Sequence, residues 1–579
     1  MKKLLIYLKG YKKETILAPL FKMLEAAFEL LIPLVVASII DVGIENGDRA
    51  YIIKMCLLMV ALGVIGLICS ITAQFYAAKA AVGFATGLRH GLFAHIQSLS
   101  FAEIDRIGTS TMITRMTSDI NQVQSGVNLV LRLFLRSPFI VFGAMIMAFT
   151  VDVKAAFVFV AAIPLLSIVV FGIMLISIPL YKKVQEALDK VLLLTRENLT
   201  GVRVIRAFGM EEEEKERFAE SNLLLLKLQK YVGKISALMN PVTYIIINSA
   251  VIALIWIGGE QVYEGMITQG QVVALVSYMS QILVELIKLA NLIITVTKAI
   301  ACGNRIQAVF EIECSLEEAQ EKMREVENTD AKILFEKVGL TYPGNAEESL
   351  KDIDFAVRKG ETVGVIGGTG SGKTSLVHLI PRFYDATRGR VLIDGRDVKE
   401  YPLCELRKKI AIVLQKSVLF SGTIRENLLW GREDATEEEL WEALEISQSK
   451  EFVEQKEKGL ETNISQGGKN LSGGQKQRLT IARALVKQPE ILIMDDSASA
   501  LDFATDAALR KAIREMKNPP VVFIVSQRAA SVLQADKILV LEDGGIAGMG
   551  THEELLQSCE VYQEIYYSQA ARGNGKEGR

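Results

Sequence analysis

Long uncharged apolar segments fill the first half of this chain, and they constrain its fold more than any other feature. One of them, AFVFVAAIPLLSIVVFGIMLISIPL at 156–180, runs for 25 residues without a charged side chain. A helix needs about 20 apolar residues to cross a bilayer, so a transmembrane helix explains such a segment better than a buried helix of a soluble core. The segments that meet this requirement are 15–42, 52–76, 128–150, 154–180, 237–259 and 269–293.

The second half of the chain has a different character. Half of the 579 residues are hydrophobic and 23% are charged, but the long apolar runs lie before residue 300. Residues 315–579 have the composition of an ordinary soluble domain. We therefore expect a multidomain protein, with an all-α transmembrane domain of six long helices at 1–310, a linker at 311–332 and a soluble α/β domain at 333–579.

Basic residues predict the orientation in the membrane. The three short loops between consecutive apolar segments contain one basic residue, Arg49, whereas the long connections 77–127 and 181–236 are rich in Lys and Arg. By the positive-inside rule, the amino terminus and both long connections are cytoplasmic. An even number of spans then places the soluble half in the cytoplasm of a multi-pass cell-membrane protein. The start, MKKLLIYLKGYKK, is too interrupted by lysines for a cleaved signal peptide.

Charge and metal-binding side chains argue against several classes of partner. The formal net charge of −2 gives no reason to expect nucleic acid. The six cysteines form no CxxC pair, and the four histidines are widely separated in sequence, so neither a zinc site nor a disulfide framework is expected in a cytoplasmic domain.

A phosphate-binding loop lies in the soluble half. In ETVGVIGGTGSGKTSLVHLI, a β-branched strand runs into the loop and then into a helical apolar pattern, which is the context that G-x-x-x-x-G-K-[ST] requires. The glycines let backbone N–H groups approach a phosphate, the lysine supplies positive charge, and the final threonine can bind Mg²⁺. We expect ATP with Mg²⁺ to bind this loop, which consists of Gly367, Gly368, Thr369, Gly370, Ser371, Gly372, Lys373 and Thr374.

Two adjacent aspartates end a second apolar strand, in ILIMDDSASALD at 491–502. Carboxylates at the carboxyl ends of core strands lie where α/β proteins bind ligands. Asp495 therefore suits Mg²⁺ coordination, directly or through water. The role of Asp496, one residue further on, depends on the class of P-loop protein.

The pentapeptide before the helix in LSGGQKQRLTIARAL decides that class. It consists of Leu471, Ser472, Gly473, Gly474 and Gln475, and it resembles the signature of ATP-binding cassette (ABC) domains. Tyr342 matches the aromatic residue that stacks on adenine, Gln415 in IAIVLQ matches the Q-loop glutamine, and Asp502 ends a match to the D-loop. With six preceding spans, the whole chain resembles a half-transporter of the type IV exporter class.

The resemblance implies several features beyond the motifs themselves. Cassettes of this family dimerise head to tail, so each ATP lies between the Walker motifs of one chain and the signature of the other. The resemblance also implies that Gln415 is both a metal-binding residue and a catalytic residue. Both long connections are expected to be helical and to carry coupling helices near Ser100–Asp105 and Phe208–Glu213, although plain solvated turns remain an alternative there. The run Glu211–Glu214 is expected to form a solvated face.

Two positions depart from the family pattern. The family usually has glutamate after the Walker B aspartate, where its carboxylate polarises the attacking water, and Asp496 is one methylene shorter. The family's switch histidine is replaced by Gln527, which cannot carry a positive charge near the γ-phosphate. A third and weaker departure is Gln466, where an acidic residue is expected. The Walker side of the site therefore looks impaired and the signature intact, which favours a heterodimer with a second half-transporter over a slow homodimer.

Several functional hypotheses follow from this pattern. The first is an ATPase-driven exporter half that moves hydrophobic or amphipathic substrates (small molecules, lipids or peptides) out of the cytoplasm, and the second is an ATP-gated regulatory or channel-like subunit. A slow homodimeric lipid or peptide exporter is a third. Charged residues within or near the spans indicate either a substrate pathway or a plain lining of a cytoplasmic cavity, with an i,i+3 salt bridge as the alternative for Glu285 and Lys288. These charged residues are Glu25, Glu29, Arg132, Arg136, Glu285 and Lys288.

Overall fold

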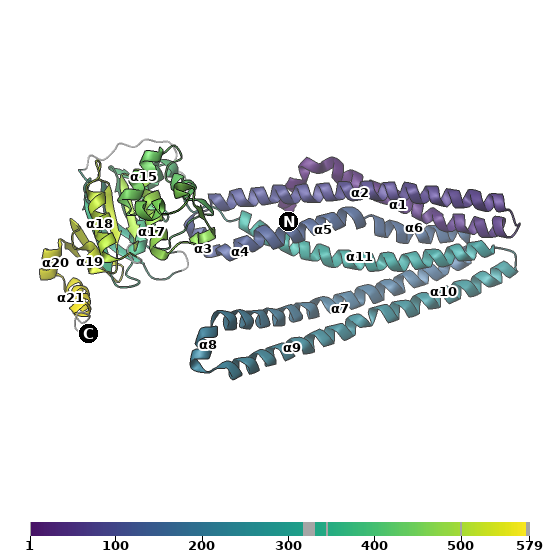
Figure 1. Cartoon of the computed structure of the whole chain (residues 1–579). Coiled ribbons are helices and arrows are strands. Elements are labelled where there is room, and N and C mark those ends of the chain that lie inside the picture. The colour runs from purple at the N-terminus through teal and green to yellow at the C-terminus, as the bar shows by residue number, and fades with distance from the viewer. Residues whose placement is uncertain (1, 317–329, 343–344, 498–500, 575–579) are drawn as a thin grey trace. The chain divides into compact units, whose positions relative to one another are not determined.

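The computed structural model describes residues 2–316, 330–342, 345–497 and 501–574 (Figure 1). These residues form two compact units. The first contains the chain up to Gln97 and Thr109–Ile312, and the second combines Ser98–Gly108 with the residues from Glu313 onward. Most of the predicted linker lies outside the described residues, because 317–329 are not among them.

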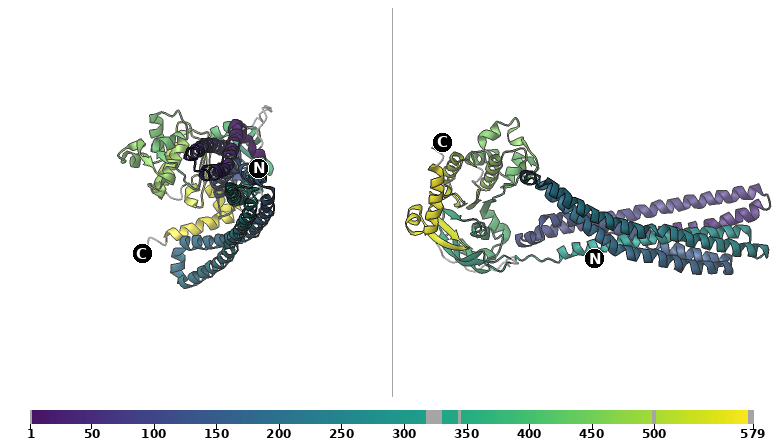
Figure 2. Two further views of the ribbon diagram at one scale, coloured as in Figure 1. Left: turned by 90° about the vertical axis from the view of Figure 1, so that its right-hand side faces the viewer. Right: turned by 90° about the horizontal axis from the view of Figure 1, so that it is seen from below.

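Long helices make up the first unit, as Figure 1 and the right-hand view of Figure 2 show. Within the described residues, six helical stretches are long and apolar enough to cross a membrane, and each contains one of the six predicted segments. The short helices between them are α3 (Phe101–Ile107) and α8 (Val202–Phe208), and the third stretch begins with the short helix α4 (Thr109–Thr114). The long ones are α1 (Lys12–Ser38), α2 (Arg49–Ser98), α5 (Ile120–Leu133), α6 (Arg136–Val151), α7 (Val153–Thr200), α9 (Glu211–Ala237), α10 (Met239–Tyr263) and α11 (Gln269–Phe310).

Small residues let these helices approach closely. A Cβ atom at Gly126 on α5 would lie 2.3 Å from the Cβ atom of Ala299 on α11, so this crossing has no room for a larger side chain. Lipid tails are as apolar as leucine, so helices in a bilayer associate through such close packing rather than through hydrophobic burial. Helix α11 packs against α1, α5, α6, α7 and α10, which makes it central to the first unit.

An internal ion network accounts for most of the charges found near the spans. Arg136 on α6 lies 2.6 Å from Glu285 on α11 and 2.7 Å from Glu29 on α1. Glu285 also accepts hydrogen bonds from Ser137 and Lys288, each at 2.8 Å. The ion-pair interpretation of Glu285 and Lys288 is thus confirmed. These bonds join three helices and satisfy charges that would be costly in a membrane without partners.

No separate short helix occupies the second predicted coupling position, 208–213. The short helix of that connection, α8, spans Val202–Phe208, and α9 begins at Glu211. Gly209 ends α8 in the left-handed conformation, with φ of 65°. The acidic run Glu211–Glu214 forms the first turn of α9, where negative charge is favourable at a helix amino terminus, and it is largely exposed as predicted.

The second unit is built on a six-stranded sheet of order β12-β11-β3-β10-β9-β6, in which only β12 is antiparallel to its neighbour among the described pairings. The sheet strands are β3 (Thr362–Gly367), β6 (Ile410–Val413), β9 (Ile491–Asp495), β10 (Val521–Val525), β11 (Lys537–Glu542) and β12 (Gly545–Gly550). A second sheet has the order β2-β1-β4-β5 and consists of β1 (Ile333–Leu340), β2 (Leu350–Val357), β4 (Arg388–Ile393) and β5 (Arg396–Asp397). The short strands β7 (Gly422–Thr423) and β8 (Asn463–Ile464) form a pair.

Alternating side chains divide the six-stranded sheet between two cores. On β10, Val522 and Ile524 face one core, which is shared with the helices α14 (Ile424–Leu429), α15 (Glu437–Ile446) and α17 (Gly473–Val486). Phe523 faces the other core, which is shared with α12 (Lys373–Leu379) and the second sheet. Strands buried on both faces read as continuous apolar runs, which explains why the sequence pattern of these strands is so clear. The helices of this unit are α12 (Lys373–Leu379), α13 (Leu403–Lys409), α14 (Ile424–Leu429), α15 (Glu437–Ile446), α16 (Lys450–Glu454), α17 (Gly473–Val486), α18 (Phe503–Arg514), α19 (Ala529–Val532), α20 (His552–Ser558) and α21 (Glu560–Asn574).

Candidate functional site

The loop after β3 has the shape of a phosphate cradle. A Cβ atom at Gly367 would lie 2.2 Å from the carbonyl oxygen of Leu541, so the strand end can pass β11 only as glycine. Gly372, with φ of 94°, leads into α12 and has no room for a Cβ atom beside the carbonyl oxygen of Ser349. The two glycines therefore fix where the chain turns, and the loop backbone between them is exposed for an anion.

Lys373 lies across this loop rather than in solvent. Its side chain is buried, and Nζ donates to the carbonyl oxygens of Gly367 at 2.9 Å and Gly368 at 2.5 Å. Burial lowers the pKa of the Lys373 ammonium group, while the nearby charges of Asp495 and Asp496 oppose that shift. A positive charge is thus held at the mouth of the cradle, where a β- or γ-phosphate would sit.

Thr374 and Asp495 bring two oxygen ligands together. The Thr374 hydroxyl donates to Oδ1 of Asp495 at 3.1 Å, at the carboxyl end of β9. Both are hard oxygen ligands beside a phosphate cradle, which fits Mg²⁺ held jointly by protein and nucleotide. The described residues contain no group of three or more His, Cys, Asp or Glu side chains that could hold a metal ion.

Asp496, directly after β9, has an unusual backbone conformation. Its φ is 46°, in the left-handed region, and its N–H donates to the carbonyl oxygen of Val525 at 2.9 Å. Oδ2 of Asp496 accepts from Nε2 of Gln415 at 3.3 Å. Aspartate adopts this conformation more readily than glutamate because its short side chain is tolerated there. The backbone conformation and the shorter acid are therefore mutually consistent.

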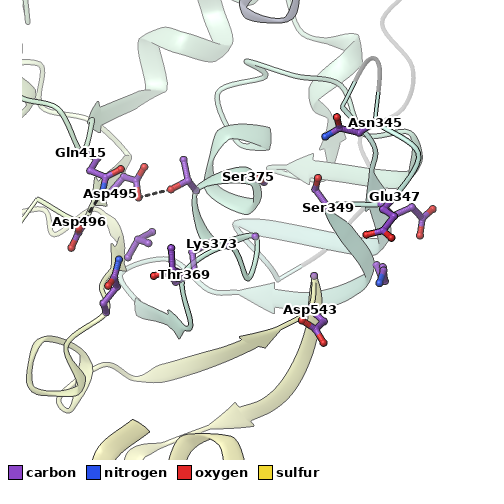
Figure 3. A pocket seen from close by; sticks show the side chains of 18 of the residues that line it. Asn345, Glu347, Ser349, Thr369, Lys373, Ser375, Gln415, Asp495, Asp496 and Asp543 are labelled. Atoms are coloured by element: carbon purple, nitrogen blue, oxygen red, sulfur yellow. Dashed lines mark hydrogen bonds between the residues drawn. The ribbon is translucent and has the colours of Figure 1, made fainter. Parts of the chain in front are cut away.

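One cavity of about 1050 Å³ connects these groups (Figure 3). Figure 3 shows Lys373, Asp495, Asp496 and Gln415 around one end and Asn345, Glu347, Ser349 and Asp543 around the other. Gln527, directly after β10, also lines it. The structure therefore gathers the P-loop, the Walker B pair, the Q-loop and the switch position at the carboxyl ends of four neighbouring strands, β3, β10, β9 and β6, as expected for an α/β sheet.

The remaining predicted site residues do not line this cavity. The Tyr342 hydroxyl donates to Ser375 at 2.9 Å, and its ring packs edge-on against Tyr384 at 5.0 Å. Burial raises the pKa of the Tyr342 hydroxyl. The aromatic residue predicted to stack on adenine thus lies beside the P-loop helix but outside the cavity lining.

The signature residues form the start of α17. Ser472 caps that helix, because its Oγ accepts from the N–H of Gln475 at 3.2 Å and Oε1 of Gln475 accepts from the N–H of Ser472 at 3.0 Å. Leu471 is buried, whereas Ser472 and Gly473 are exposed and Gly474 is partly exposed. Asp502 caps α18, and the D-loop residues before Leu501 lie outside the described part of the chain. Gln466, the third departure from the family pattern, is exposed in a short turn.

Helix α3 packs within the cassette unit and confirms a short helix near the first predicted position. Ser100 caps it, the ring of Phe101 stacks on Phe383 at 4.2 Å, and the Tyr384 hydroxyl donates to Asp105 at 2.6 Å. Tyr384 also contacts Tyr342. A continuous set of side-chain contacts therefore joins this segment, which follows α2 in the chain, to the P-loop helix.

Sequence reasoning missed several residues of the site. Glu347, Glu348, Lys351 and Asp543 line the cavity, and Ser375 and Tyr384 contact Tyr342. Ser375 could have been noticed because it directly follows the P-loop. Asp543 is part of a DG turn, but its place at the cavity follows from the parallel pairing of β11 with β3.

Acidification should weaken the Mg²⁺-dependent binding of nucleotide. The loss should begin at a higher pH than it would if the metal ligand were an aspartate with an ordinary pKa. Burial raises the pKa of Asp495, so its carboxyl group takes up a proton earlier as the pH falls, and the protonated group is a poor metal ligand. Fluorescence titration with a labelled ATP analogue between about pH 7.5 and 4.5 would measure this loss. The Asp495→Asn variant should bind weakly with a flat profile over the same range. If Asp495→Asn lost binding over the same pH range as the wild type, a group other than Asp495 would be responsible for the pH dependence.

Comparisons with known proteins agree with this geometry. Residues 15–286 match the family model described as ABC transporter transmembrane region, and residues 350–499 match the model described as ABC transporter. The chain is 36% identical over 572 residues to an uncharacterized ABC transporter ATP-binding protein, YfiB, of Bacillus subtilis, with 99% of each chain covered. It is 30% identical over 561 residues to the ATP-dependent lipid A-core flippase of Salmonella typhimurium, with 96% of each covered.

A solved structure shows the same fold. A bacterial Atm1-family ABC exporter with ATP bound superposes with a TM-score of 0.78 at 23% identity. The match covers 96% of this chain and 98% of that one, so both units and their order along the chain are shared.

Proposed function

Because the chain belongs to the ABC transporter family and joins a transmembrane region to an ATP-binding domain, we propose that it is one half of an ATP-driven exporter of hydrophobic or amphipathic molecules. It is a multi-pass membrane protein with a cytoplasmic domain of the ABC ATPase family. Its similarity to a lipid A-core flippase supports an amphipathic substrate, and ABC exporters act as dimers.

The P-loop side of the site binds ATP in this proposal. The loop backbone from Gly367 to Gly372 and the Lys373 ammonium group hold the phosphates. Thr374 and Asp495 hold Mg²⁺, which neutralises charge on the β- and γ-phosphates. Tyr342 contacts the adenine, and Gln415 orients groups around the metal and the attacking water. Of these side chains, Lys373 and Asp495 are the most deeply buried, so their positions are fixed by the surrounding protein before ATP binds.

The site binds ATP but hydrolyses it slowly, and the observation that carries this proposal is the pairing of Asp496 with Gln415. The carboxylate that should polarise water instead accepts a hydrogen bond from the Q-loop amide, and it is one methylene short of the family's glutamate. On the neighbouring strand end, Gln527 offers hydrogen bonds but no positive charge. A misplacement of about 1 Å can reduce the rate roughly 10²-fold.

A different partner chain completes the second site. The signature Leu471–Gln475 is intact and caps α17 in an exposed position, suited to meeting the phosphates bound by a neighbouring cassette. A partner with glutamate and histidine at the matching positions would then hydrolyse ATP against this signature. Closure of the two cassettes would move α3 through its contacts with Phe383 and Tyr384, and so turn the membrane helices outward.

The purified chain alone should bind Mg²⁺-ATP normally but turn it over well below the exporter range of about 1–10² s⁻¹. Binding by fluorescence titration and phosphate release should be measured on the same sample. Lys373→Ala should abolish binding, since it removes the buried charge at the cradle. Turnover at ordinary exporter rates by the isolated chain would instead indicate an active homodimer.

Reconstitution distinguishes an exporter from an ATP-gated channel. In proteoliposomes that contain both chains, we expect an amphipathic substrate to stimulate ATPase activity and to accumulate against its gradient. Flux that only follows the gradient, without stimulated hydrolysis, would contradict the export proposal.

A further inference from the structure

The loop that carries Gln527 is held by a side chain from the end of the chain. Nε2 of Gln569 donates to the carbonyl oxygen of Gln527 at 2.8 Å, and Oε1 of Gln569 accepts from the N–H of Ala529 at 2.9 Å. One amide thus binds the peptide groups on both sides of Arg528, whose backbone is extended with φ of −95° and ψ of 119°. A carbonyl needs a donor and an N–H needs an acceptor, so these partners fix the orientation of the amide.

The rest of this loop is bonded to the cassette itself. The N–H of Ser526 donates to the carbonyl oxygen of Val365 at 3.1 Å, and the N–H of Arg528 donates to Oγ of Ser526 at 2.9 Å. The guanidinium group of Arg528 lies 5.6 Å from the ring centre of Phe503, the first residue of α18. Gln569 therefore adds two bonds to this loop, one to the carbonyl oxygen of Gln527 and one to the N–H of Ala529.

Helix α21 is a firm support for Gln569. Tyr562 is fully buried, its hydroxyl lies 2.8 Å from Nδ1 of His552, and burial raises the pKa of that hydroxyl to about 12. Tyr562, Tyr566 and Gln569 are spaced i, i+4 and i+7, so they share one face of the helix. That face packs against α19, β3 and β11. Gln569 is thus held beside the loop by a helix that is buried at Tyr562, two turns earlier.

We propose that Gln569 is a positioning residue, by which the carboxyl-terminal helix sets the switch loop and so the rate of hydrolysis at this site. Its two bonds are to backbone atoms, so they persist whichever side chain occupies position 527. Loss of Gln569 would free the peptide groups at 527–529 and let the switch side chain move out of reach of the γ-phosphate. The inference rests on the proposed role of Gln527 as the switch position.

Hydrogen–deuterium exchange of the full-length chain tests the contact without using catalysis. In Gln569→Ala, the amide of Ala529 should exchange about 5-fold faster, because a typical net hydrogen bond is lost. Gln563→Ala is the matched control, since Gln563 lies on the same helix and donates to Leu556 instead of the switch loop. Unchanged exchange at Ala529 in Gln569→Ala would overturn the proposal.

ATPase kinetics test the positioning role in variants with a restored catalytic acid. Adding Gln569→Ala to Asp496→Glu/Gln527→His should lower kcat about 5-fold with KM for ATP unchanged. Adding it to Asp496→Glu/Gln527→Ala should change kcat little, because no switch group remains to be positioned. Equal losses in both backgrounds would show a merely structural role and overturn the proposal. If the restored pair shows no gain of its own, the proposed function fails, and the exchange result alone decides whether Gln569 holds the loop.

Discussion

Replacing Asp496 by glutamate and Gln527 by histidine together should raise hydrolysis at this chain's Walker site by about 10²-fold, or about 2.7 kcal/mol in the barrier. Glutamate extends the carboxylate by about 1–1.5 Å toward the attacking water. Histidine restores a group that can donate to the γ-phosphate and stay in register with the acid. Gln527→His alone leaves the attacking water without a carboxylate in reach, and Asp496→Glu alone leaves the negative charge of the transition state without a partner.

The gain in ATPase rate of the double variant should therefore exceed the product of the gains of the two single variants, because catalytic groups that act as a unit are not additive. Transport per ATP should fall at the same time, since a site that holds ATP through many cycles keeps the cassettes in partial contact. ATPase activity and vesicular uptake on the four variants of a double-mutant cycle would measure both quantities. Strictly multiplicative effects with unchanged coupling would show that Asp496 and Gln527 are incidental.

Backbone strain is the main complication in that experiment. Position 496 has a φ of 46°, and a non-glycine residue in that region costs about 1–2 kcal/mol. Glutamate is expected to carry slightly more of this cost than aspartate. Thermal unfolding of each variant should be recorded, so that a loss of folded protein is not counted as a loss of catalysis.

In the complex with its partner, Ser472→Ala should lower total ATPase activity by about 10²-fold. The Ser472 hydroxyl is exposed at the start of α17, and we expect it to donate to the γ-phosphate bound by the partner cassette. Asp496→Asn should lower total activity less than twofold, since this chain's own Walker site contributes little. The reverse order of severity would show that the two sites have been assigned wrongly.

Loss of the helix cap must be separated from loss of the phosphate contact. Ser472 also caps α17, and removal of a capping residue costs about 1 kcal/mol of stability. Thr436→Ala is a matched control because Thr436 caps α15 with the same reciprocal bonds to Glu439 and is not part of the signature. That variant should lose similar stability and keep its ATPase activity.

Local patterns in the sequence were sufficient for much of this protein. Apolar runs of about 20 residues predicted all six membrane-spanning helices, because each run satisfies its own backbone hydrogen bonds within one helix. The P-loop and the Walker B strand were equally clear, since glycines and β-branched residues fix a strand, a turn and a helix within about 20 residues. Parallel pairing of β3, β9 and β10 then brought Lys373, Asp495 and Gln527 to one edge, as strand ends predict.

Contacts between distant segments were decided by the tertiary structure alone. Arg136 pairs with Glu285, Gln415 with Asp496, and Gln569 with the loop at Gln527, across separations of 149, 81 and 42 residues. The helix boundaries around 208–213 also differ from the prediction, because a left-handed turn at Gly209 ends α8 and the acidic run begins α9. Sequence periodicity determines which face of an element is apolar. Which polar side chains then meet depends on how the packed elements are rotated and offset, and no local pattern encodes that.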